Sequence, residues 1–248
     1  MLQIQNGRVL TMAGKTFENG QVLIENGKIK SVGEYLSIPN AKAEVIDARG
    51  GWILPGLIEA HCHIGITEEK KGFEGDDCNE VNQPVIPYLK ALDAVNPMDS
   101  AFHNALSAGI TAVMVGPGSS NVVGGQFLVM KTHGRVMDQM VVKEPAAMKV
   151  AFGENPKTNY SGQNKVPSTR MSVGALLRDE LTRAQNYCSR KETAQQKGEA
   201  FEEDYQMECW LPVLTGKIPM KAHVHRADDI LTAIRIAKKF GLGLTLDH

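Results

Sequence analysis

Short apolar runs separated by turn residues fill the first part of the chain, at residues 2–4, 22–24, 29–32, 45–46 and 52–54. Asn6-Gly7 and Asn26-Gly27 follow the first two runs. An Asn-Gly pair between alternating runs is a strong hairpin signal, because both residues tolerate a positive φ. We therefore expect residues 1–54 to form a small N-terminal β-sandwich segment that is too small to be stable by itself.

Beyond Pro55 the pattern changes to longer apolar runs that alternate with helical ones. The predicted strands cover residues 109–115, 147–152, 218–224 and 242–246, and the predicted helices cover residues 99–108, 172–197, 202–214 and 227–240. The helix over 172–197 is expected as either a continuous or a broken element, with a solvated face. Alternating strands and helices are typical of α/β folds, so residues 55–248 predict a barrel or an open sheet.

The last thirty residues form the clearest unit of the pattern. Asp228 and Asp229 open the predicted helix over 227–240, and Lys238 and Lys239 close it. These charges complement the helix dipole, and Gly241 suits the position after the helix end. A strand, a helix and a second strand in this order imply parallel strands joined by a right-handed crossover.

Charge and composition exclude several classes of protein. The chain carries 27 basic and 28 acidic residues, a net charge of −1, without a basic stripe for nucleic acid. No apolar run reaches the ~18 residues that span a bilayer, so we expect no membrane partner. The N-terminus lacks a signal-peptide layout, and the four cysteines form no CxxC pair, so we expect a cytoplasmic protein with free thiols.

Two histidines, His61 and His63, close the apolar run that ends in GLIEAHCHIG. Residues i and i+2 of a strand point to the same side, so both imidazoles can reach one ion. The alternative is a pair of polar residues at a solvated strand end. The same spacing recurs at His223 and His225, and His248 ends the next predicted strand.

Five of the seven histidines therefore fall at the C-terminal ends of predicted strands, where the active sites of α/β folds form. We interpret His103 and His133, which do not fit this pattern, as structural. Imidazoles combined with a carboxylate suit a divalent metal, most often Zn²⁺, as one or two ions.

Two further charged residues lie in or just after the strand predicted over residues 147–152. Glu154 follows it in FGENPK, where it could also be a plain turn residue. Lys149 lies inside it, as either an edge lysine, a salt-bridge partner or a functional group. This lysine could bind a metal only after losing its positive charge, for example as a carbamate.

The segments VLIENGKIKSVGE and VIDARGGWILPGLIEAHCHIG resemble the opening of the amidohydrolase superfamily, in particular its imidazolonepropionase-like members. MKAHVHRADDI is similar to the fifth barrel strand of that family, and LTLDH to the end of the sixth. The resemblance implies a partial TIM-type (β/α)8 barrel over residues 55–248, preceded by the β-sandwich segment.

The resemblance also implies roles for the candidate residues. The metal ligands would be His61, His63, Glu154, His223 and His248. FGENPK resembles deacetylase-type members, which favours Glu154 as the bridging ligand, whereas MKVAFG resembles prolidase-type members, which favours Lys149. His225 is the rival of His223 at the fifth strand, and His225 and Lys149 are the catalytic candidates.

The implied function is metal-dependent hydrolysis of a C–N bond in a small molecule, such as an amide, a cyclic amide or an amine-bearing ring, by a water that the metal activates. In the family the general base is an aspartate on the eighth strand, and only six strands are visible here. A barrel alone takes ~250 residues. We therefore expect a fragment that a second chain or a further C-terminal part completes; its activity by itself and a homo-oligomer are both left open.

Two other functions stay open at this stage. The glycine- and serine-rich stretch VGPGSSNVVGG, residues 115–125, could cradle a phosphate and make the chain a nucleotide-binding α/β module, or it could be a substrate loop or a flexible turn. A non-catalytic remnant of an enzyme is the second alternative. The polar stretch over 66–87 is long enough to be a functional lid.

Overall fold

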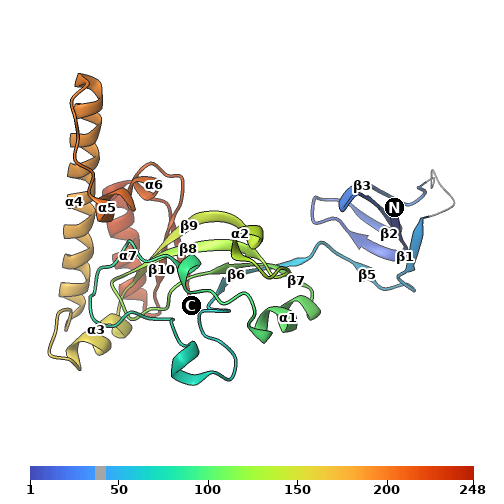
Figure 1. The fold of residues 1–248 in the computed structure, drawn as a ribbon, viewed down its shortest axis with the longest axis horizontal. Coiled ribbons are helices and arrows are strands. Elements are labelled where there is room, and N and C mark those ends of the chain that lie inside the picture. The colour runs from blue at the N-terminus through green and yellow to red at the C-terminus, as the bar shows by residue number, and fades with distance from the viewer. Residues whose placement is uncertain (37–42) are drawn as a thin grey trace. The chain divides into compact units, whose positions relative to one another are not determined.

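The computed structural model describes residues 1–36 and 43–248, which fall into two compact units, Met1–Leu57 and Ile58–His248 (Figure 1). In the first unit the strands are β1 (Leu2–Leu10), β2 (Thr16–Glu25), β3 (Lys28–Gly33), β4 (Glu44–Asp47) and β5 (Trp52–Ile53). They belong to one hydrogen-bonded sheet of order β3-β2-β1-β4, with β5 also paired to β1. The described residues of this first unit thus form a single sheet, whereas the sequence predicted a sandwich.

The two Asn-Gly pairs have different structural roles. Asn26-Gly27, with φ of 53° and 73°, turns the chain between β2 and β3 as predicted. The hairpin predicted at Asn6-Gly7 is wrong, because both residues lie inside β1 at a shift in its register with β2. The shift falls between the part of β1 that pairs with β4 and the part that pairs with β5.

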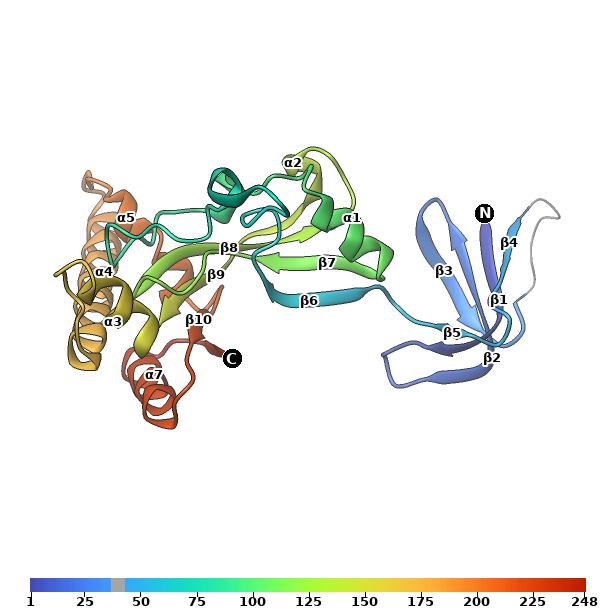
Figure 2. The same cartoon turned by 90° about the horizontal axis from the view of Figure 1, so that it is seen from below.

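The second unit is built on a six-stranded sheet of order β11-β10-β9-β8-β7-β6. Its strands are β6 (Leu57–Cys62), β7 (Ile110–Val115), β8 (Val123–Lys131), β9 (Val141–Ala151), β10 (Met220–His223) and β11 (Leu244–Asp247). The predicted α/β class is confirmed, and the sheet curls into a half-barrel (Figure 2). β9, β10 and β11 are parallel, and the parallel pairing of β10 with β11 was predicted from the last thirty residues.

One strand departs from the expected pattern. β8 is antiparallel to both β7 and β9, so the sheet is mixed. β8 was not predicted, because the glycine- and serine-rich residues 115–125 indicate a loop and no strand was expected directly after them. Short α2 (Met137–Met140) connects β8 to β9 and takes the place of a long crossover helix.

Helix boundaries follow their capping residues. α1 (Ser100–Ser107) begins after Asp99, whose carboxylate accepts a hydrogen bond from the Ala101 amide. α4 (Arg170–Lys197) is one continuous helix between a Thr169 capping box and Gly198. The helix predicted over 202–214 is wrong in extent, because two short helices, α5 (Tyr205–Glu208) and α6 (Leu211–Leu214), replace it.

α7 (Ala227–Phe240) has the predicted bounds and ends at Gly241, whose φ is 68°. Figures 1 and 2 show α4 and α7 beside the β9–β10 end of the sheet. Met207 and Trp210 are buried in the core beneath α4. Among the residues that the structure describes, none of the helices combines the length and the hydropathy that a membrane crossing requires.

Candidate active site

The histidines that end three strands meet at one edge of the sheet. His61 lies near the end of β6, His63 just after it, and His248 follows β11. The ring centroid of His61 lies 5.2 Å from that of His63 and 5.1 Å from that of His248. His223, the last residue of β10, lies 4.7 Å from His248, and His225 lies 4.4 Å from His223. We call these five residues the histidine cluster.

The imidazoles of His61, His63 and His223, which we call the inner imidazoles, each have a polar neighbour behind them. Nδ1 of His63 lies 2.7 Å from the carbonyl oxygen of Gly116, which can only accept, so Nδ1 carries the proton and Nε2 is free. Nδ1 of His61 lies 3.3 Å from Oδ2 of Asp247, without the geometry of a hydrogen bond. Nε2 of His223 lies 3.1 Å from Nδ2 of Asn155.

The inner imidazoles are neutral at neutral pH. Burial, and then the charge of Lys149, lower the pKa of His61 to about 4, although Asp247 acts in the opposite direction. The same two causes lower the pKa of His223 to about 3. Burial also lowers the pKa of His63. Neutral imidazole is the form of histidine that binds a metal ion.

Lys149 lies beneath this cluster. It is not at a sheet edge, because its strand, β9, is flanked by β8 and β10. Its side chain is fully buried, and Nζ has no hydrogen-bond partner. Burial lowers the pKa of Lys149 to about 8, with Asp247 and Lys221 acting in opposite directions. Asp247 instead pairs with Lys221, at 2.8 Å, so the salt-bridge alternative for Lys149 does not hold.

Glu154 lies elsewhere, as the first residue of α3 (Glu154–Ser161) after Gly153, whose φ is 76°. Its side chain is 70% exposed, and Oε1 lies 4.0 Å from Nδ1 of His225, which is also exposed. The two candidates for the bridging position therefore differ in place: Lys149 lies under the histidine cluster, and Glu154 lies at its open side.

The donor atoms of this site fit a divalent cation, although no group of three or more His, Cys, Asp or Glu side chains among the described residues is already arranged around an ion position. Both ring nitrogens of His61, Nδ1 of His223, Nζ of Lys149 and Oδ2 of Asp247 are buried without a hydrogen-bond partner. Buried polar atoms without partners are costly, at ~1–3 kcal/mol each. A coordinated cation would engage one deprotonated ring nitrogen of each imidazole and the carboxylate oxygen of Asp247, and it would engage Lys149 only after that side chain had lost its positive charge.

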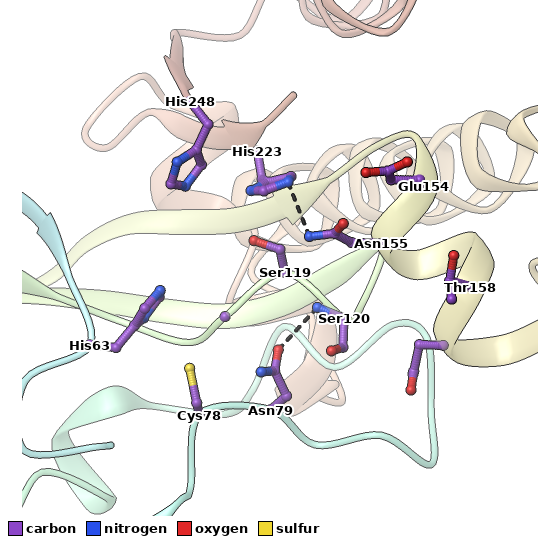
Figure 3. A pocket seen from close by; sticks show the side chains of 12 residues that line it. His63, Cys78, Asn79, Ser119, Ser120, Glu154, Asn155, Thr158, His223 and His248 are labelled. Carbon is purple, nitrogen blue, oxygen red and sulfur yellow. Dashed lines mark hydrogen bonds between the residues drawn. The ribbon is translucent and has the colours of Figure 1, made fainter. Parts of the chain in front are cut away.

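A pocket of about 650 Å³ opens in front of the histidine cluster (Figure 3). His63, His223 and His248 line one side of it. The remaining lining consists of polar residues and one glycine: Cys78, Asn79, Gly118, Ser119, Ser120, Glu154, Asn155, Thr158 and Asn159. Its volume falls in the range of ~300–1,000 Å³ typical of small-molecule sites.

Several residues of this site were missed in the sequence. Asp247 directly precedes His248, and Lys221 shares a strand face with His223 at i+2 spacing, so both carried a signal. Asn79 and Asn155 come from a loop and a helix start, where no periodicity marks a functional side chain. The lid expected over 66–87 includes Cys78 and Asn79, which line the pocket.

The chain is similar in sequence or fold to several known proteins. The crystal structure of an amidohydrolase from Thermotoga maritima MSB8 has 45% sequence identity and a TM-score of 0.94, covering 100% of this chain and 64% of that one. Amidohydrolase tasK from Hapsidospora irregularis is 26% identical over 252 residues, 92% of this chain and 26% of its own length. No protein-family model matches the chain.

A dihydroorotase from Trichlorobacter lovleyi is 40% identical over 178 residues, which are 71% of this chain and 41% of the dihydroorotase. The chain thus spans less than two thirds of the length of each of these three relatives.

Proposed function

Because these comparisons confirm the resemblance to the amidohydrolase superfamily, we propose that the chain forms the metal-binding part of a hydrolase that acts on a C–N bond of a small molecule. One observation carries the proposal. Imidazoles from the ends of β6, β10 and β11 converge at one edge of a curled sheet, and ring nitrogens of His61 and His223 are buried without a partner. Strand packing explains why these positions meet, but it does not explain buried imidazole nitrogens that have no partner.

The proposed metal ligands are His61, His63, His223 and His248, and the ion would be Zn²⁺ or a similar divalent cation, singly or as a pair. When bound, such an ion supplies Lewis acidity and lowers the pKa of a water molecule to about 7. The protein's own contribution is orientation. Gly116 fixes the tautomer of His63, and Asn155 contacts the far nitrogen of His223.

For the bridging position we now favour Lys149 over Glu154. Lys149 is buried beside the inner histidines with an unpartnered nitrogen, whereas Glu154 points to solvent. A lowered pKa makes the neutral amine accessible, and a neutral amine can combine with CO₂ to give a carbamate and one proton. His225 stays the catalytic candidate, because its exposed imidazole lies beside the pocket lining at Glu154 and can move a proton there.

Elemental analysis of the purified protein tests the proposal. We expect near-stoichiometric divalent metal in the wild type and a large loss in His61→Ala. His103→Ala is the matched control, because His103 lies in α1 and lines a different pocket. Equal metal content in all three proteins, or none in the presence of added Zn²⁺, would remove the basis of the proposal.

The nucleotide-binding alternative has less support. A phosphate-binding turn of the usual kind leads into a helix N-terminus. Here the glycine- and serine-rich stretch connects β7 to another strand, β8, and its Ser119 and Ser120 face the pocket of the histidine cluster. We therefore propose that it is a substrate loop. Completion of the barrel by a further segment or chain also stays a proposal.

A further inference from the structure

A second cavity, of about 320 Å³, lies between the N-terminal parts of α4 and α7. Its walls come from these two helices and from Phe152 and Gly153, the two residues that follow β9. We call it the helix cavity. None of the described residues that line it also lines the pocket of the histidine cluster. Its volume reaches the lower end of the ~300–1,000 Å³ range of small-molecule sites, so it is a separate candidate site.

Three guanidinium groups belong to the lining of the helix cavity. Arg170 and Arg178 come from α4, and Arg235 comes from α7. Nη1 of Arg178 lies 3.0 Å from the position that a Cβ on Gly174 would take. Because Gly174 is buried, the guanidinium of half-buried Arg178 lies over bare helix backbone. Two helices thus bring three like charges to one cavity, where an anion would relieve their mutual repulsion.

Both carboxylates of this lining already have arginine partners. Nε of Arg170 donates to the two oxygens of Asp229, at 3.0 and 3.2 Å. Arg226, from outside the lining, donates to Asp228 through Nε and Nη2, at 2.9 and 3.0 Å. Among the described residues, these pairings leave the other two guanidinium groups of the lining without an acidic partner in it.

The carboxylate of Asp229 is held in place and is not free to turn toward another arginine. Its side chain is only 8% exposed. A Cβ added at Gly153, whose φ is 76°, would lie 2.5 Å from Oδ2 of Asp229, so the carboxylate packs directly on this turn. The ion pair of Arg170 with Asp229 is therefore part of the wall, and the remaining guanidinium groups face the cavity with unused donors.

We propose that the helix cavity binds the phosphate group of a small phosphorylated molecule. A guanidinium presents a planar fork of N–H donors that matches two phosphate oxygens, and a dianion can serve two such groups at once. Arg178 and Arg235 hold the phosphate, and exposed Met171 offers the rest of the ligand an apolar contact. This site goes beyond the proposed hydrolysis, because neither the metal nor the histidine cluster takes part in it.

Calorimetric titration of the purified protein with inorganic phosphate tests this inference. The titration is done at constant ionic strength and about pH 8, where a phosphate group carries two charges. Arg178→Gln and Arg235→Gln should each weaken binding by about 10-fold or more, because each removes a charge-assisted contact. Arg178→Lys should restore only part of the affinity, since an ammonium group cannot form the bidentate contact.

Arg190→Gln is the matched control, because Arg190 is exposed on the same helix outside the cavity and the change of charge is the same. It should leave phosphate affinity within about twofold. His61→Ala is the second control, since phosphate can also bind a metal ion, and it should retain the binding that depends on the arginines. Acetate, which carries one charge, should bind the wild type at least ~10-fold more weakly than phosphate.

Binding that is lost in His61→Ala and kept in both glutamine variants of the cavity would place the anion at the metal and overturn the inference. No detectable binding, or equal effects of Arg178→Gln and Arg190→Gln, would overturn it as well. Acetate binding as tight as that of phosphate would assign the arginines to a carboxylate instead. Metal content, measured on the same samples, should be unchanged in the cavity variants, so the failure of either proposal leaves the other intact.

Discussion

The amide of Asn155 lies against the imidazole of His223, with Nδ2 3.1 Å from Nε2, and the other ring nitrogen of His223 is buried without a partner. A metal ion can bind His223 through Nδ1 only if Nε2 carries the proton. The amide must then present its oxygen to Nε2, by a rotation that exchanges its two ends. Asn155 thereby becomes the residue that sets the tautomer of a ligand.

The first prediction follows from that contact. Asn155→Leu removes the acceptor while keeping the volume, and we expect Zn²⁺ affinity to fall by about 10-fold or more, measured by competition with a chelating dye. Asn155→Asp retains an acceptor and should lose much less. Thr158→Val is the control on the same helix, because Thr158 lines the pocket from α3. Equal affinities in Asn155→Leu and the control would exclude the positioning role.

The second prediction separates Lys149 from Glu154. Lys149→Met should lower metal content strongly, and it should raise the free energy of unfolding of the metal-free protein by ~1–3 kcal/mol, because it removes a buried nitrogen that has no partner. Glu154→Gln should leave both quantities nearly unchanged, since its side chain is exposed. Metal retained in Lys149→Met and lost in Glu154→Gln would reverse the assignment.

The third prediction concerns acid stability of the metal-free protein. His61 has a folded-state pKa of about 4, against a usual value near 6.5, so the unfolded chain binds more protons between these limits. Stability is therefore complete above the unfolded pKa and is lost as the pH falls through this window. We expect the free energy of unfolding to drop by about 2 kcal/mol per such histidine between about pH 7 and pH 5.

Chemical denaturation of the wild type and His61→Gln checks this dependence after chelation of the metal. The variant should show a shallower pH dependence, because one buried neutral imidazole is gone, whereas His103→Gln should keep the wild-type slope. A wild-type stability that stays constant or increases toward low pH would contradict the burial-driven shift. Added Zn²⁺ should steepen the dependence, since protons then compete with the ion for the imidazoles.

The convergence of the histidines was predictable because strand geometry is regular. Side chains at i and i+2 share a face, and the ends of parallel strands meet at one edge, so His61, His63, His223 and His248 could be placed together without coordinates. The bounds of α7 were predictable for the same kind of reason, since acidic residues, basic residues and Gly241 mark its ends.

Other features depend on contacts that no local pattern encodes. β8 runs antiparallel within a sheet whose strands β9, β10 and β11 are parallel. The hydrophobic pattern of β8 does not indicate in which direction the strand runs. Asn6-Gly7 has the composition of a turn, but β1 changes partner there and absorbs it as an irregularity. Whether Lys149 or Glu154 faces the histidines depends on a glycine-led turn into α3 that places the glutamate outside.

The last prediction concerns the loop that carries Asn79. Nδ2 of Asn121, which is buried just before β8, lies 2.6 Å from the carbonyl oxygen of Glu80, 2.7 Å from that of Gln83 and 2.9 Å from the hydroxyl of Tyr160. Asn121→Ala leaves these acceptors without their donor, so we expect ~1–3 kcal/mol lower stability and faster amide hydrogen exchange over residues 79–83, with metal content unchanged. Asn82→Ala, which loses only the exposed hydrogen bond that its Nδ2 donates to Glu80, is the control. Unchanged exchange in Asn121→Ala would mean that the loop holds its shape by itself.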